Sequence, residues 1–298
     1  MAFSLRATLE NAHDDGIWSV SWSSSGQLLT GSCDETCRSH VVVDNTIKKV
    51  HEYRGHNLGI TSVTTSATTA VSTSLDSHIR AWDLETGEEI SDIDSGPLEA
   101  WTASISTDSS TLFTGTQNGC LNVWNMASRS RMQCLPTGSL SFVMSVACSP
   151  AGGHVACANA DGAIFIFDSD SGKLLASLDS HAARVRSLAF SADGTLLASG
   201  SDDAHVNLYD VGKRALAAVL AGHGSWVLGV SFSPDGALLA SCGADRTVRL
   251  WSVANKVLVQ TLVDAHEGQV WGVAFDPTNS KRLASVGEDK ALKLWADA

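Results

Sequence analysis

An aromatic residue recurs every 42 to 44 residues along this 298-residue chain, and this repeat constrains the fold more than any other feature. The repeated positions are Trp82, Trp124, Phe167, Tyr209, Trp251 and Trp295, with His40 where the first aromatic is due. Six residues before each lies an acidic or amide residue: Asp34, Asp76, Asn118, Asp161, Asp203, Asp245 and Asp289. Self-similarity at such a period is typical of repeat architectures built from one supersecondary unit.

The unit from Gly222 to Trp251 shows what each repeat builds. Apolar residues alternate with small or polar ones from Val227 to Phe232, and Pro234-Asp235-Gly236 follows as a turn. A period of two, interrupted by turns that contain Asp, predicts an antiparallel meander and not a helix. Such a sheet cannot bury both faces alone, so the seven units must stack on one another.

Each unit also repeats polar residues around its turn Asp. The set is complete in units two, six and seven: His56, Ser72, Asp76 and Trp82; His223, Ser241, Asp245 and Trp251; His266, Ser285, Asp289 and Trp295. An imidazole can donate to the carboxylate and accept from the hydroxyl, and the indole adds a donor. A Ser-His-Asp catalytic triad is the alternative, but a nucleophile site occurs once and not periodically. We therefore expect a structural relay of hydrogen bonds.

The other units keep this set only in part. Unit one has His13, Thr30 and Asp34 but lacks the Trp, and unit five has a phenol, that of Tyr209, in place of the indole. Gly96 and Ser139 replace the opening His in units three and four. We expect these last two units to depend more on apolar packing.

The periodic His, Asp and Trp positions resemble the WD40-repeat family. This resemblance implies an all-β fold, a seven-bladed β-propeller of four-stranded blades around a central channel, as one domain over residues 1–298. The last unit ends at Trp295, one strand short, and Phe3 to Leu9 are the candidate for that strand. Thr8-Leu9 parallels Thr261-Leu262 of an outer strand. We expect the N-terminal strand to close the ring, which removes exposed sheet edges.

Composition excludes several classes of partner. A net charge of −12 counts against direct nucleic-acid binding, which needs a basic face. No apolar run approaches the roughly 20 residues of a membrane helix, and the first residues do not form a signal peptide. Seven scattered cysteines suggest a reducing compartment, and Cys33 and Cys37 lack further ligands for zinc. We expect no cofactor, no metal and no small-molecule substrate.

Four of the nine tryptophans have no role in the repeat. Trp18, Trp101, Trp226 and Trp271 lie three or five residues after the opening position, where each innermost strand begins at one mouth of the channel. The same mouth is expected to carry these further residues: Phe142, Arg184, Arg186, Asp14, Asp15, Glu99 and Glu267. Aromatic residues with acidic neighbours are typical of a peptide-binding hot spot. The alternative is that the indoles only line the channel. We expect a partner segment with an apolar anchor and an Arg or Lys.

Segments outside the relay resemble one branch of the family, the WD40 subunits of the superkiller complex, which animal cells also place in the polymerase-associated factor complex. The segments are 12–20, 74–85, 95–102, 222–228 and 269–273. The resemblance covers all seven units and departs at Cys37-Arg38-Ser39-His40. It implies a non-enzymatic scaffold, cytoplasmic and nuclear, whose mouth binds a short Gln-Arg and aromatic motif. The implied partner is a tetratricopeptide subunit that also holds an RNA helicase feeding the exosome.

Two other classes of function are a cullin substrate receptor and an enzyme built on a propeller. Substrate receptors of cullin ubiquitin ligases usually carry Arg two residues after the Asp that follows the relay Trp, where this chain has Glu85, Ala127, Asp170, Gly212 and Ala254. A propeller enzyme would need metal-binding carboxylates in the channel, where the inner strands offer Val, Ser, Ala and Phe. Use of the scaffold in another large assembly remains open.

Overall fold

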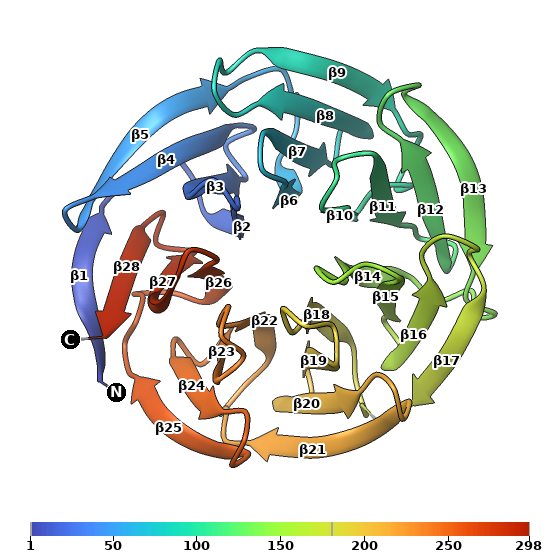
Figure 1. Ribbon diagram of the computed structural model, residues 1–298. Coiled ribbons are helices and arrows are strands. Elements are labelled where there is room, and N and C mark those ends of the chain that lie inside the picture. Colours follow the sequence, from blue (N-terminus) through green and yellow to red (C-terminus); the bar gives the residue numbers. More distant parts are fainter. Residues whose placement is uncertain (1, 180, 298) are drawn as a thin grey trace.

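The computed structural model describes residues 2–179 and 181–297, which form strands, turns and loops without helices. Seven four-stranded antiparallel sheets surround a central channel as blades (Figure 1). The all-β propeller implied by the resemblance to WD40 repeats is confirmed. None of the described residues forms a helix that could span a membrane.

The strands of blades one to six follow one another from the channel outwards. Blades one and two contain β2 (Ile17–Trp22), β3 (Gln27–Ser32), β4 (Cys37–Val43), β5 (Thr46–Tyr53), β6 (Ile60–Thr65), β7 (Thr69–Ser74), β8 (His78–Asp83) and β9 (Glu89–Asp94). Blades three and four contain β10 (Thr102–Ile105), β11 (Thr111–Gly115), β12 (Cys120–Asn125), β13 (Ser130–Pro136), β14 (Val143–Cys148), β15 (His154–Asn159), β16 (Ala163–Asp168) and β17 (Leu174–Asp179). Blades five and six contain β18 (Val185–Phe190), β19 (Leu196–Ser201), β20 (His205–Asp210), β21 (Ala215–Ala221), β22 (Val227–Phe232), β23 (Leu238–Gly243), β24 (Val248–Ser252) and β25 (Val257–Leu262).

Blade seven combines the two ends of the chain. It contains β26 (Val270–Asp276), β27 (Asn279–Gly287) and β28 (Leu292–Asp297), and its outer strand is β1 (Phe3–Leu9). β1 pairs antiparallel with β28, from Phe3 opposite Asp297 to Leu9 opposite Leu292. The Gln260 side chain of blade six holds both the N–H and the carbonyl of Phe3 at 2.8 Å. The predicted closure of the ring by the N-terminal strand is confirmed.

Apolar cores lie between neighbouring blades. The large aromatic residue of the third strand is buried in blades two to seven, and Trp251 and Phe167 are 2% and 1% exposed. Alternation along the strands explains this arrangement, because each sheet turns one apolar face to each neighbour. The blades are therefore held together mainly by burial of apolar surface.

Side-chain hydroxyls also join the innermost strands. Ser19 accepts the N–H of Val63 at 3.0 Å, and equivalent bonds run from each blade to the next as far as blade seven. They join Ser62 to Ala103, Ser104 to Cys148, Ser145 to Leu188, Ser187 to Val230 and Ser231 to Phe275. Between blades seven and one the described residues show no such bond, and Gly272 packs there so closely that a Cβ atom would lie 2.9 Å from Val20 Cγ1. These contacts fix the seven strands that line the channel.

Candidate functional site

The relay of blade six has the geometry expected from its residue types. His223 Nδ1 lies 2.9 Å from Asp245 Oδ2, and His223 Nε2 lies 2.7 Å from Ser241 Oγ. Trp251 Nε1 donates to the same hydroxyl oxygen at 2.8 Å. Burial alone would raise the pKa of Asp245, but hydrogen bonds and the charge of His223 outweigh burial and hold that pKa well below its usual range.

Blades two and seven have the same arrangement, with His–Asp and His–Ser distances of 2.8 to 2.9 Å. Trp82 and Trp295 donate to the hydroxyls of Ser72 and Ser285 at 3.1 and 2.8 Å. In blades one and five the imidazoles of His13 and His181 make the same two contacts. The imidazoles are buried, so a substrate could not reach a hydroxyl activated by them. This geometry favours a structural role.

Blades three and four have no such relay. In blade three Glu99, which the sequence places at the binding mouth, accepts a hydrogen bond from Asn122 Nδ2 at 2.9 Å. In blade four Cys157 and Phe167 occupy the hydroxyl and aromatic positions, and the Ser139 hydroxyl accepts bonds from the N–H of Ser141 at 3.1 Å and from Asn159 at 3.4 Å. Blade three keeps the indole–hydroxyl bond, from Trp124 to Thr114 at 2.9 Å, and both blades lack the imidazole. That these two blades depend more on apolar packing stays a prediction.

Blade one departs from the pattern at His40. Its imidazole lies in the aromatic position and is 0% exposed, and neither ring nitrogen makes a well-aligned hydrogen bond to the described residues. Burial, assisted by the nearby His13, lowers the pKa of His40 to about 3. The imidazole is therefore neutral near neutral pH, and it is a weak point in this blade.

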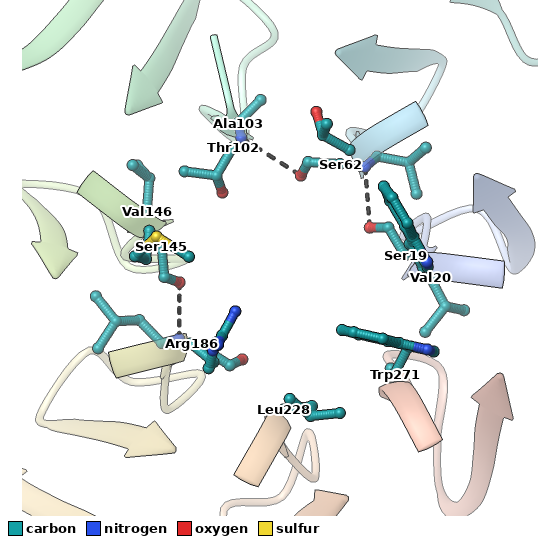
Figure 2. Close-up of a pocket in the computed structure, with 18 of the residues that line it drawn as sticks. Ser19, Val20, Ser62, Thr102, Ala103, Ser145, Val146, Arg186, Leu228 and Trp271 are labelled. Carbon is teal, nitrogen blue, oxygen red and sulfur yellow. Dashed lines mark hydrogen bonds between the residues drawn. The ribbon is translucent and has the colours of Figure 1, made fainter. Parts of the chain in front are cut away.

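The central channel encloses a cavity of about 270 Å³ at the tryptophan-rich mouth. Trp18, Trp101, Trp271 and Arg186 line it, and Figure 2 shows Trp271, Leu228 and Arg186 around the opening from three different blades. The rings of Trp18 and Trp271 lie 6.1 Å apart. These four predicted residues therefore form one continuous lining.

Three further predicted residues lie next to the cavity lining, either in contact with it or close to it in sequence. Phe142 packs edge-on against Trp101 with ring centroids 5.4 Å apart. Trp226 is 46% exposed and stacks against the Arg186 guanidinium at 5.5 Å. Arg184 begins the same blade-five segment as Arg186 and is exposed, with no ion pair to the part of the chain that the structure describes. Aromatic surface thus continues from the channel onto the rim.

The charged side chains at this mouth differ in how readily a partner could reach them. Arg186 makes two bonds of 2.9 Å to Asp202, a partner that spacing alone did not reveal. Asp14 pairs with Arg38 at 3.5 Å, but its side chain is 85% exposed, and Asp15 and Glu267 are exposed as well. Glu99 is instead held within blade three by Asn122 and Arg131. A basic partner residue would therefore meet Asp14, Asp15 or Glu267 more readily than Glu99.

The described residues include no group of three His, Cys, Asp or Glu side chains that could hold a metal ion. The channel is lined by hydroxyls, aromatic rings and small apolar residues, and Arg186 is neutralised by Asp202. Such a lining suits contact with a peptide better than acid–base chemistry.

Two family models together match most of the chain. The model described as "WDR36/Utp21 first beta-propeller" matches residues 35–253, and the one described as "WD domain, G-beta repeat" matches residues 3–39 and 256–296. The chain belongs to the WD40-repeat family. Neither match indicates a catalytic family.

Three relatives share this repeat. WD repeat-containing protein SL1-17 of Schistosoma mansoni is 34% identical over 193 residues, which are 62% of this chain and 64% of that protein. WD repeat-containing protein VIP3 of Arabidopsis thaliana is 37% identical over 201 residues, 61% of this chain and 62% of VIP3. Meiotic recombination protein rec14 of Schizosaccharomyces pombe is 28% identical over 184 residues, 60% of each chain. The chain therefore spans less than two thirds of the length of these relatives.

Proposed function

We propose that this WD40 propeller is a non-enzymatic adaptor whose tryptophan-rich mouth binds a short segment of a tetratricopeptide scaffold subunit. The assembly proposed is an RNA-decay complex of the superkiller and exosome type, in the cytoplasm, with a second assignment in the nuclear polymerase-associated factor complex. The single observation that carries the proposal is the aromatic surface that continues from the channel onto the exposed Trp226.

Physical chemistry supports binding at this surface. Large aromatic residues at the centre of an interface contribute about 2 kcal/mol or more each, and they lose little side-chain entropy on binding. The half-buried indoles of Trp18 and Trp271 are already held by their mutual packing, so the site is largely preformed. Exposed Asp14, Asp15 and Glu267 would accelerate association with a basic segment.

The class of partner rests on the resemblance of five segments to the superkiller WD40 subunits. Those segments include Trp18, Trp101, Trp226 and Trp271, so the resemblance and the exposed aromatic surface coincide. The cullin-receptor alternative lacks its arginine after the aromatic of units two to six, and it gains no support from the geometry. Service in another large assembly would use the same mouth with a different segment.

The test is capture of the chain by an immobilised tetratricopeptide subunit. Trp226→Ala and Trp271→Ala should each weaken binding by about 30-fold, the equivalent of about 2 kcal/mol. Leu258→Ala is the matched control, because this exposed apolar residue lies on outer strand β25, away from the mouth. Melting curves should not change. Full binding by both tryptophan variants would move the site to another face of the propeller.

A further inference from the structure

An open hollow of about 470 Å³ lies on blade four, where the relay is missing. It shares no lining residue with the cavity at the mouth. The lining residues that matter here are Ser139, Asp161, Phe165, Ser177 and Asp179. His181 also lines the hollow, but its Nδ1 lies 2.8 Å from Asp203 Oδ2 in the relay of blade five. Ser139 stands where other blades carry the relay histidine, so this wall of the hollow has a hydroxyl in place of an imidazole.

The other blades show which charged side chains lie near the corresponding position. Two residues before the repeated aromatic lies an arginine in blades one, two and six: Arg38, Arg80 and Arg249. The guanidinium groups of Arg38 and Arg249 lie 3.7 Å from the turn carboxylates of their own blades. Arg80 instead reaches two carboxylates of outer strand β9, at 2.7 and 2.9 Å. In each of these blades a guanidinium neutralises carboxylates next to the relay.

Blade four has Phe165 at the arginine position. Its ring is almost fully buried and faces the core shared with blade three. Blade four therefore lacks both cations of the pattern, the relay histidine and the arginine. Its carboxylates nevertheless remain.

Two carboxylates at this hollow have no partner among the described residues. The turn Asp of blades one, two, five, six and seven is hydrogen-bonded to a relay histidine. The carboxylate of Asp161 makes no hydrogen bond or ion pair within residues 2–179 and 181–297, and neither does that of Asp179. Both side chains are exposed. Ala163 follows Asp161 by two residues, and Asp179 lies opposite Ala163 in the β16–β17 pair. Both negative charges would attract a cation that enters the hollow.

We propose that the blade-four hollow receives an arginine side chain from a protein partner. The guanidinium would take the place that Arg38 and Arg249 occupy in their own blades and pair with Asp161 and Asp179. Its planar array of N–H donors suits two carboxylates better than a lysine ammonium does. Its aliphatic stem would pack over Ala163 and the edge of Phe165. This site goes beyond the mouth and does not depend on which scaffold binds there.

The experiment uses a small probe and no partner protein. N-acetyl-arginine amide is titrated into the full chain and followed by the backbone amide resonances of Gly138, Gly162 and Ala163. N-acetyl-citrulline amide, which has nearly the same shape without the charge, is the ligand control. Asp161→Asn is compared with Asp170→Asn, which makes the same charge change at an exposed position in the β16–β17 hairpin. Ser139→His serves as a third variant, because the introduced imidazole should fill the hollow.

Saturable shifts at these amides with a Kd in the millimolar range are expected for the arginine probe and not for the citrulline probe. Asp161→Asn should weaken binding about fivefold, whereas Asp170→Asn should leave it unchanged. Ser139→His should abolish the shifts. The proposal is overturned if the arginine probe gives no saturable shift, if citrulline acts equally, or if Asp170→Asn has the same effect as Asp161→Asn. None of these outcomes depends on capture by the tetratricopeptide subunit.

Discussion

Blade six and blade four have the same four-stranded sheet, although only blade six has a relay. His223, Asp245, Ser241 and Trp251 are joined in blade six, and the corresponding positions of blade four hold Ser139, Asp161, Cys157 and Phe167. Both blades bury their aromatic residue almost completely. The alternation of apolar residues and the burial of one aromatic are therefore sufficient to form a blade. The relay is an addition that secures the loop and the turn at one end of the blade.

The largest expected effect tests the buried aromatic residue that blades four and six share. Trp251→Ala and Phe167→Ala should each destabilise the protein by about 3–5 kcal/mol, because each removes a fully buried ring and leaves a cavity. Chemical denaturation of both variants measures the free energy of unfolding. A much smaller loss for Phe167→Ala would show that blade four is not held by its aromatic, and the comparison would fail.

The second prediction tests the relay, which blade six has and blade four lacks. Asp245→Ala should cost about 1–3 kcal/mol, because it leaves the buried His223 without its acceptor. Asp161→Ala should change stability by less than about 0.5 kcal/mol, because the carboxylate is exposed and has no partner in the part of the chain that the structure describes. Unfolding curves of the two variants provide the measurement. Equal losses would mean that blade four has a carboxylate contact equivalent to the relay.

Much of this organisation could be predicted from spacing. The offset from the opening position placed Trp18, Trp101 and Trp271 on one channel wall, because every repeat enters its innermost strand at the same point. The closing strand was predictable from the parallel between Thr8-Leu9 and Thr261-Leu262.

Contacts between strands were harder to predict, because they depend on which rotamer each side chain adopts and which residue lies opposite. The bond from Asn122 to Glu99 and the pairing of Arg186 with Asp202 are of this kind. The hollow on blade four did have a signal in the sequence. Phe165 stands where three other units carry arginine, and comparison of the units at that one position could have identified it.

The last and smallest prediction concerns blade one, which keeps the relay of blade six but has lost its aromatic. His40 has a pKa of about 3 in the folded chain and an ordinary value near 6.5 when unfolded. Below pH 6.5 the unfolded chain therefore binds a proton at His40 that the folded chain does not bind. The contribution of His40 to the free energy of unfolding is complete above pH 6.5 and decreases as the pH falls below it. Between pH 7 and pH 5.5 this residue should cost about 1 kcal/mol.

His40→Phe gives blade one the aromatic residue of blade four and should remove this part of the pH dependence. The relay carboxylates do not interfere, because Asp34 and Asp245 have pKa values below the usual range and stay ionised throughout this interval. The measurement is the free energy of unfolding of the parent and of His40→Phe at both pH values. Parallel losses in the two proteins would contradict the assignment, since the pH dependence would then arise from other histidines such as His13 or His56. A flatter profile for His40→Phe would show that a relay without its aromatic leaves a blade sensitive to acid.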